Sequence, residues 1–334
     1  PPRSTQGVSS AASDVYKRQA RMIPERLNID LNNSLKESPQ LKESYEALSE
    51  TKDLIDTARE LEGVTRHKSV HAAGVVISKD PLNEVVPLEF TSRGEADSTV
   101  MTQYSMDPIA SLGLLKMDFL GLVNLTVLDR ATKMIGDKDG SRLNLLDIPL
   151  DDKETFGLLS RGETVGVFQL ESSGMRRYIQ KLKPSSLGDV AAMIALYRPG
   201  PMEHIDTFIR AKHGEIPIRY PHSMLQDILE ETYGVIVYQD QVLLIAQAFA
   251  GYSLGEADVV RKAMGKKIPE VMQHEGEKFI EGALSKGFTR ELAEEVFQLI
   301  EPFAGYAFNK AHSVCYALIA YWTAYLKSNY PEEY

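Results

Sequence analysis

Apolar residues near the N-terminal end of the chain recur at the spacing of helical turns. Between residues 20 and 66, Leu41, Tyr45, Leu48 and Ile55 follow one another at helical intervals, with Glu and Lys between them. This pattern is typical of amphipathic helices. Prolines interrupt it, so we expect several short helices that form a small helical subdomain.

Residues 71–122 change to short runs rich in β-branched and other apolar side chains. The runs at 74–78, 85–88, 99–104 and 112–120 are separated by turn-forming residues. Several short runs within such a span predict a β-sheet. The proline in the second run favours an edge strand at that position.

Residues 124–334 have a mainly helical pattern. Ser186 with Asp189, just before an apolar run, has the spacing of a helix-capping signal. The most apolar stretch, 311–326, contains several polar residues. It is also shorter than the roughly 20 apolar residues of a membrane span. We therefore expect a buried helix there and no membrane association.

The composition is that of an ordinary globular protein. Of 334 residues, 43% are apolar and 25% are charged, which excludes a disordered or collagen-like chain and predicts about two or three domains. The single cysteine, Cys315, excludes a disulfide framework and fits a reducing, cytoplasmic location. The net charge of −10 excludes a generally basic nucleic-acid-binding surface but permits a local basic groove.

Lys116 and Asp118 are the first residues with candidate chemistry. Because side chains alternate along a strand, these two would lie on one face, with Leu115 and Met117 on the other. The ammonium would keep the carboxylate ionised, which suits Mg²⁺, and the ammonium itself suits a phosphate. A structural ion pair is the commoner meaning of this spacing, and one aspartate does not make a metal site.

Two runs of basic residues contain no acidic residue. One spans 176–183 and the other spans 261–267, with four positive charges in each. Both suit the phosphates of a nucleotide or of a nucleic-acid backbone. A solvated helix face is the commoner meaning of any single run of this kind.

Two further polar positions stay open between a structural and a binding role. Arg198 follows an apolar helical run and precedes a Pro-Gly-Pro turn, so it either faces an anion or caps the helix. Asn309, Lys310 and His312 gather where the last apolar helix begins. They are either phosphate or sugar contacts or an ordinary polar helix start.

Several common catalytic motifs are absent from the sequence. It contains no P-loop, no dinucleotide-binding glycine motif and no nucleophile elbow. His67 and His71 have the spacing of a helical metal pair, but no cysteine or acidic partner completes a site. We therefore interpret both histidines as structural, and a metal-dependent phosphohydrolase lacks the His/Asp cluster that it would need.

The two ends of the chain differ from the rest. Residues 1–19 are mostly small and polar, and 14–19 resemble a translated sequencing adapter. We expect an adapter-derived or disordered leader there, outside the fold. The last residues stop just after a predicted helix, which leads us to expect a fragment that is truncated at its C-terminal end.

Seven segments in order along the chain carry a family resemblance. Among them, GLLKMDFLGL at 113–122, ALYRPGP at 195–201 and FAGYAFNKAHS at 303–313 resemble the α (polymerase) subunit of bacterial DNA polymerase III, a C-family DNA polymerase. The other segments lie at 61–78, 165–175, 233–242 and 251–267. The resemblance covers nearly the whole chain from residue 20 onwards.

The resemblance implies an α+β fold built on a polymerase-β-like nucleotidyltransferase palm. Residues 20–70 would be the end of a helical thumb, and 71–123 the second part of the palm sheet. Residues 124–334 would form a large, mainly helical fingers domain. This division follows from the order of domains in the family and not from the periodicity of the sequence.

The resemblance also implies roles for individual residues. Asp118 matches the third of three palm aspartates that hold two Mg²⁺ ions, and the first two would lie upstream of this segment. Lys116 matches a palm lysine near the primer end and the phosphates. The positions that match nucleotide-binding residues are Arg261, Lys262, Ser173, Gly174, Arg198, Asn309, Lys310 and His312.

The implied activity is template-directed addition of dNTPs to a primer 3′-OH by two-metal phosphoryl transfer. The implied partners are primer–template DNA, dNTPs and, through regions outside this segment, the sliding clamp and other replicase subunits. Because one carboxylate cannot hold two metal ions, we expect the segment alone to be inactive. Two alternatives stay open: a non-catalytic nucleic-acid-binding module and an error-prone polymerase paralogue.

Overall fold

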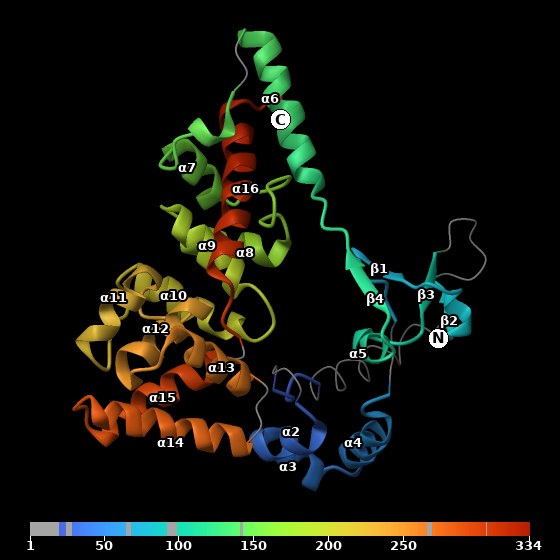
Figure 1. The fold of residues 1–334 in the computed structure, drawn as a ribbon, viewed down its shortest axis with the longest axis vertical. Helices are drawn as coiled ribbons and strands as arrows, with labels where there is room; N and C mark the ends of the chain where they lie inside the picture. The colour runs from blue at the N-terminus through green and yellow to red at the C-terminus, as the bar shows by residue number, and fades with distance from the viewer. Residues whose placement is uncertain are drawn as a thin grey trace. The chain divides into compact units, whose positions relative to one another are not determined.

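The computed structural model describes residues 20–24, 29–64, 68–91, 99–140, 143–265, 269–304 and 306–334. The chain divides into two compact units, Pro1–Leu122 and Val123–Tyr334, whose elements are labelled in Figure 1. The named strands of the described part all belong to the first unit, and helices make up most of the second. The chain is therefore α+β, as predicted. The predicted leader, residues 1–19, lies outside the described residues.

Short helices open the described part of the first unit, where the apolar spacing predicts them. The first two begin at side-chain caps: Asp30 accepts a hydrogen bond from the backbone N–H of Asn33 at 2.6 Å, and Ser38 accepts one from Leu41 at 3.3 Å. Leu41 and Ile55 are buried in the core that the helices share. The helices are α2 (Leu31–Glu37), α3 (Pro39–Ala47) and α4 (Ser49–Leu61).

The strands of the first unit form two antiparallel pairs in place of one continuous sheet. β1 (Gly74–Ile77) pairs with β4 (Leu115–Asp118), and β2 (Leu88–Phe90) pairs with β3 (Val100–Thr102). Helix α5 (Met106–Ser111) follows β3 in the chain and leads into β4. Strand pairing thus brings the start of the β-rich region next to its end.

One predicted strand was wrong in its position. The run at 85–88 enters a strand only at Leu88, because Leu82–Glu84 form a 3₁₀ turn and the backbone N–H of Val86 still donates to the carbonyl of Leu82. Of the apolar residues that suggested a strand, Val86 is buried and Val85 is exposed.

Helix α16 (Lys310–Asn329) is the central element of one part of the second unit (Figure 1). It packs against α9 (Leu187–Leu196), α7 (Lys153–Arg161) and α6 (Val123–Asp139). Ala317, Ala320, Tyr321 and Ala324 are buried, which confirms the predicted buried helix. In the part of the chain that the structure describes, we find no helix with the length and apolar character needed to cross a membrane.

Helix α12 (Gln239–Ala250) is the central element of the other part of the second unit. It packs against α13 (Leu254–Gly265), α14 (Pro269–Ser285) and α15 (Arg290–Ala304) around a core rich in phenylalanine. The second unit also contains α8 (Ser173–Leu182), α10 (Ile205–Lys212) and α11 (Gln226–Leu229).

Candidate functional site

Lys116 and Asp118 lie side by side on one face of β4, as the alternation of strand side chains predicts. The ammonium of Lys116 donates a hydrogen bond to Oδ1 of Asp118 at 2.5 Å, and the two side chains are 24% and 39% exposed. This hydrogen bond holds the pKa of the Asp118 carboxyl below its usual range. The carboxylate is therefore ionised at neutral pH and reachable from solvent.

Gly74 and His71 complete this cluster; from the sequence alone we interpret His71 as structural and do not single out Gly74 as a site residue. Gly74 faces Asp118 in the β1–β4 register, and the space beside its Cα is filled by side chains. A Cβ atom there would lie 2.8 Å from Cε of Lys116 and 2.9 Å from Nδ1 of His71. That Nδ1 accepts a hydrogen bond from the backbone N–H of Gly74 at 2.7 Å. No local pattern signals this arrangement, because it depends on the pairing of two distant strands.

The described residues do not by themselves fit a two-magnesium site. Among them, no group of three or more His, Cys, Asp or Glu side chains is close enough to hold a metal ion. Asp118 supplies one hard oxygen ligand, and its neighbours Lys116 and His71 offer nitrogen. At least two further carboxylates would be needed for the site that the family resemblance implies.

A cavity of about 370 Å³ adjoins this cluster within the first unit. His71, Gly74 and Lys116 line it together with side chains from β1, β2, β3 and α5. Most of the other lining residues are apolar, Met101 and Ile109 among them. The cluster around Asp118 thus borders an apolar hollow and not only open solvent.

The start of α16 gathers Asn309, Lys310 and His312 in the second unit. Asn309 caps the helix: its Oδ1 accepts a hydrogen bond from the backbone N–H of His312 at 2.9 Å. The ring of His312 lies between those of Phe308 and Tyr316, at centroid distances of 5.5 and 4.2 Å. The ordinary helix start that the sequence left open is therefore present, and it also orders these polar side chains.

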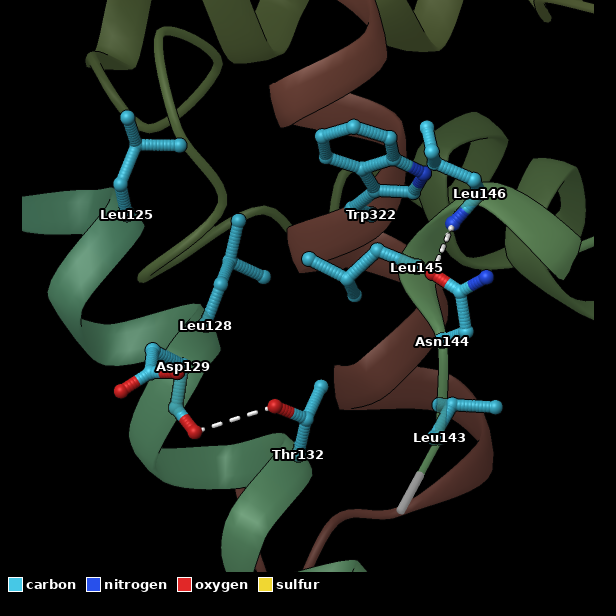
Figure 2. Close-up of a pocket in the computed structure, with 9 residues that line it drawn as sticks. All are labelled: Leu125, Leu128, Asp129, Thr132, Leu143, Asn144, Leu145, Leu146 and Trp322. Carbon is cyan, nitrogen blue, oxygen red and sulfur yellow. Dashed lines mark hydrogen bonds between the residues drawn. The ribbon is translucent and has the colours of Figure 1, made fainter.

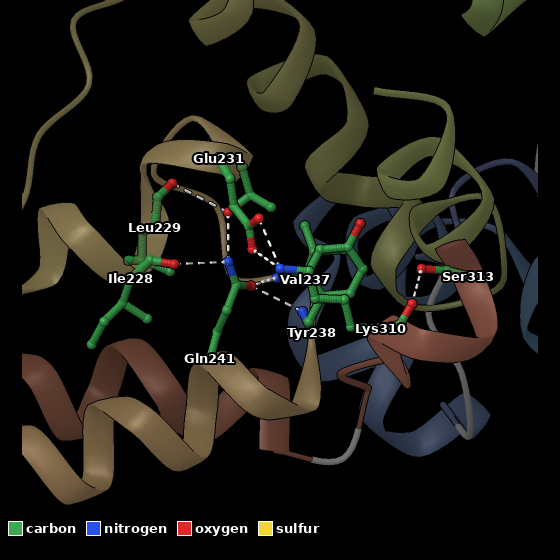
Figure 3. A network of polar contacts seen from close by, with 9 residues as sticks. Ile228, Leu229, Glu231, Val237, Tyr238, Gln241, Lys310 and Ser313 are labelled. Atoms are coloured by element: carbon green, nitrogen blue, oxygen red, sulfur yellow. Dashed lines mark hydrogen bonds and ion pairs between the residues drawn. The ribbon is translucent and has the colours of Figure 1, made fainter. Parts of the chain in front are cut away.

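Backbone pairing fixes this helix start against the entry to α12. Phe308 and Tyr238 form a parallel bridge, in which the N–H of Phe308 donates to the carbonyl of Val237 and the N–H of Gln239 donates to that of Phe308, both at 2.9 Å. As a result, the ammonium of Lys310 lies 5.6 Å from the centre of the Tyr238 ring. Figure 3 shows this region.

Lys310 is engaged by an acidic residue from a distant part of the sequence. Its ammonium donates to both carboxylate oxygens of Glu231, at 2.7 and 2.8 Å, as the dashed lines in Figure 3 show. The two side chains are 39% and 47% exposed. Sequence reasoning missed Glu231, because no motif relates it to Lys310.

Arg198 both caps a helix and reaches the segment before α16. Its Nε donates to the carbonyl of Ala195 at 2.8 Å, in the last turn of α9, and its guanidinium also donates to the carbonyl of Tyr306. The same guanidinium lies 4.6 Å from the centre of the Phe308 ring. The helix-capping role is thus observed, and it places a half-buried cation, whose pKa is lowered by burial, next to Asn309.

Ser173 and Gly174 form the first turn of α8, which begins at the Ser172 cap. A Cβ atom on Gly174 would lie 2.0 Å from the hydroxyl oxygen of Tyr197, so only glycine permits this close approach. Because Tyr197 precedes Arg198, the first turn of α8 lies close to the cap of α9. Arg198 contacts the ring of Phe308, which also contacts the ring of His312, so the structure brings Arg198, Asn309 and His312 together. Gly174 contacts Tyr197, the chain neighbour of Arg198, and Lys310 contacts Glu231 and Tyr238.

Arg261 and Lys262 lie on α13 and both engage one acid. The guanidinium of Arg261 donates a hydrogen bond to Oδ1 of Asp258 at 2.8 Å. The ammonium of Lys262 forms an ion pair with Oδ2 of the same carboxylate at 2.7 Å. The Lys262 and Arg261 hydrogen bonds lower the pKa of the Asp258 carboxyl. In the described ranges, neither cation has a hydrogen bond to the start of α16, so the structure does not join them to that group. The neighbouring Lys266 and Lys267 lie outside the described residues, as does His67.

The other basic run is partly structural. Nε of Arg176 donates to the carbonyl of Gly162 at 3.0 Å, which closes the C-terminal end of α7. Lys181 lies 3.6 Å from a carboxylate oxygen of Asp206. The sequence predicted either a phosphate-binding run or a solvated helix face here. Arg176 instead makes a structural contact between α8 and the end of α7, whereas Lys181 lies on an exposed helix face.

A pocket of about 490 Å³ between α6 and α16 contains none of the predicted site residues (Figure 2). Its walls are mostly leucines, such as Leu128 and Leu145, with Trp322 on the α16 side. Thr132 donates to the backbone carbonyl of Asp129 inside it. This pocket is therefore separate in composition from the polar group at the start of α16.

Comparisons with known proteins give the family of the chain. The family model described as the bacterial DNA polymerase III alpha subunit finger domain matches residues 124–287, and the one described as the bacterial DNA polymerase III alpha NTPase domain matches residues 3–121. The chain belongs to the bacterial DNA polymerase III α-subunit family. The two matched regions of this polymerase family meet where the structure divides into its two units.

Curated relatives in the DNA polymerase III α-subunit family align with almost the whole chain. The DNA polymerase III subunit alpha of Bacillus subtilis (strain 168) is 48% identical over 325 residues, which is 97% of this chain and 28% of the relative. That of Aquifex aeolicus (strain VF5) is 45% identical over 339 residues, 100% of this chain and 29% of the relative. That of Thermus aquaticus is 48% identical over 322 residues, 94% of this chain and 26% of the relative. The chain thus spans little more than a quarter of each.

Proposed function

We propose that this chain is part of a template-directed DNA polymerase, in which it supplies one catalytic carboxylate and most of the nucleotide-binding side chains. The observation that carries the proposal is the ionised, solvent-reachable Asp118 carboxylate, held on a strand by Lys116. The names of the relatives, DNA polymerase III subunit alpha, support the same activity. Primer–template DNA and dNTPs would be its substrates, and the clamp and other replicase subunits its partners in the cytoplasm.

We also propose a role for each part of the fold. Residues 20–70 would be the end of the thumb, 71–123 the second part of a polymerase-β-like palm, and 124–334 the fingers. The division of the chain at Leu122 and Val123 supports this assignment. So does the confinement of the named strands to the part assigned to the palm.

In the proposed palm, Asp118 and Lys116 act as a fixed pair. Asp118 would contribute one oxygen ligand to Mg²⁺, which in such sites activates the attacking hydroxyl and stabilises the leaving group. Lys116 orients the carboxylate and keeps it ionised, and its ammonium brings positive charge to the place where primer and substrate phosphates would meet. The remaining carboxylates of the site would come from residues outside the described set.

In the proposed fingers, the group around the start of α16 would bind the nucleotide. Arg198 is a planar cation held by the Phe308 ring, which suits a phosphate or a base. Lys310 would bind the polyphosphate, and His312 lies between two rings, where its own position is fixed. Arg261 and Lys262 would bind phosphates from α13.

The proposal is tested in a chimera in which residues 20–334 replace the aligned segment of the Bacillus subtilis subunit. We expect Mg²⁺-dependent primer extension by the chimera, its abolition in Asp118→Asn, and DNA affinity within about twofold of the parent. Asp107→Asn is the matched control, because Asp107 is an exposed acid in the same unit. Full extension by Asp118→Asn would contradict the catalytic role and favour the non-catalytic nucleic-acid-binding module.

A further inference from the structure

Lys310 and Glu231 form an ion pair that lies within the proposed nucleotide site. Both carboxylate oxygens of Glu231 lie within hydrogen-bonding distance of the one ammonium. A phosphate presents oxygens to an ammonium in the same way. The carboxylate therefore engages the same ammonium that an oxyanion would need to contact (Figure 3).

The turn that carries Glu231 is held in place by a buried amide. The side chain of Gln241, which is 2% exposed, donates to the carbonyl of Ile228 at 3.2 Å and to the hydroxyl of Thr232 at 2.8 Å. Its Oε1 accepts from the backbone N–H groups of Val237 and Tyr238. Glu231 thus projects from a fixed backbone.

Lys310 is fixed from the other side. The parallel bridge between Tyr238 and Phe308 sets the start of α16, and the Lys310 ammonium lies over the Tyr238 ring. Two opposite charges that are 79 residues apart in the sequence are therefore positioned to meet by the fold, and the pair does not depend on a flexible loop.

We propose that Glu231 is a displaceable counter-ion that sets the phosphate affinity of the Lys310 subsite. This inference rests on the proposed function, in which Lys310 binds the polyphosphate of a nucleotide. An exposed ion pair of this kind shifts an equilibrium by no more than about fivefold, so a polyanion can displace the carboxylate. Since the backbone of Glu231 is fixed, the displaced carboxylate stays nearby and continues to repel the bound phosphate.

If Glu231 instead supports phosphate binding, removing its charge should change the phosphate affinity in the opposite direction. If the carboxylate served mainly to hold Lys310 in a binding position, removing its charge would weaken phosphate binding. If it competes with phosphate, removing its charge strengthens binding. The direction of the change in affinity therefore separates the two roles.

The test uses the 334-residue chain and inorganic tripolyphosphate, measured by isothermal titration calorimetry at low salt. We expect Glu231→Gln to bind tripolyphosphate about three- to fivefold more tightly than the parent. Glu231→Ala serves as a second variant for the same effect. Glu230→Gln is the matched control, because it removes an equal charge from the adjacent exposed position, and it should change affinity by less than about twofold.

Lys310→Met distinguishes the inference from the proposed function. If Lys310→Met weakens binding but Glu231→Gln matches the parent, or binds more weakly, the counter-ion role is overturned and the nucleotide site stands. If Glu231→Gln still gains affinity when combined with Lys310→Met, the gain does not pass through this pair, and the inference also fails. If Lys310→Met leaves binding unchanged, or the parent shows none, Lys310 is not a phosphate ligand, and both its proposed nucleotide-binding role and the counter-ion inference fail.

Discussion

Gly74 and Asp118 face each other across the β1–β4 pair, and a Cβ atom on Gly74 would lie 3.1 Å from Oδ1 of Asp118. The same Cβ would lie even closer to Cε of Lys116 and to Nδ1 of His71. The ion pair on β4 therefore rests over a glycine that leaves room for it. This relationship connects the backbone of one strand to the position of a carboxylate on the other.

We expect Gly74→Ala to displace the Asp118 carboxylate, because its Cβ would overlap the side chains that now fill this space. In the active chimera, kcat for nucleotide addition should fall by about tenfold or more, since sub-ångström placement of reacting groups controls the rate. DNA affinity should change little. Steady-state primer extension together with a DNA-binding titration measures both.

Gly121→Ala is the matched control for Gly74→Ala. Gly121 lies in the same unit, and a Cβ there would meet nothing within 4 Å. An equal loss of activity in the two variants would show that any glycine replacement in this unit disturbs the fold. The specific packing of Gly74 against Asp118 would then have no catalytic consequence.

Local patterns in the sequence predicted local structure well. The Ser186–Asp189 spacing predicted the cap of α9, where Ser186 accepts a hydrogen bond from the N–H of Asp189 at 3.2 Å. Strand alternation placed Lys116 and Asp118 on one face, and their ion pair confirms that face. Each of these features depends on residues only two or three positions apart, so backbone geometry alone decides it.

Contacts between distant segments could not be predicted from the sequence. His71 reaches the Asp118 cluster only because β1 pairs with β4 in one register, and Glu231 reaches Lys310 only through the bridge between Tyr238 and Phe308. Both depend on tertiary packing, for which periodicity carries no signal. For this reason the sequence could assign Lys310 as a candidate cation but not Glu231, the acid that neutralises it.

The Lys262–Asp258 pair predicts a measurable change in titration. The Lys262 hydrogen bond is the largest cause of the lowered pKa of Asp258, so Lys262→Met should raise that pKa towards its ordinary value. A carboxyl with a lowered pKa stabilises the fold above its unfolded-state pKa, and this contribution is lost as the pH falls through the folded-state value. In Lys262→Met, the loss of folding stability that Asp258 causes on acidification should therefore be smaller than in the parent.

Carboxyl carbon NMR from pH 2 to 7 measures this shift, and Glu256 is the internal control. The pKa of Glu256 is lowered mainly by hydrogen bonds from Ser253, which Lys262→Met leaves intact. An unchanged Asp258 titration in the variant would mean that Lys262 does not pair with it in solution. Equal shifts of Asp258 and Glu256 would indicate a general loss of positive charge and not a specific pair.

Gly282 on α14 tests how closely two helices pack in the second unit. A Cβ atom at this position would lie 2.4 Å from the backbone oxygen of Ala250 at the end of α12, and a backbone atom cannot move aside as a side chain can. Gly282→Ala should therefore destabilise the chain by roughly 1–3 kcal/mol through overpacking, measured by chemical denaturation of the second unit.

The contrasting variant is Gly255→Ala on α13, where a Cβ would meet nothing within 4 Å. An alanine in an unobstructed helical position is favoured over glycine by about 0.5–1 kcal/mol, so this variant should gain stability. The same substitution in two helices of one unit is thus expected to change stability in opposite directions. The difference between the two changes in stability reports the contact of residue 282 with Ala250. If Gly282→Ala also stabilised the chain, α12 and α14 would not approach each other as closely as the structure shows.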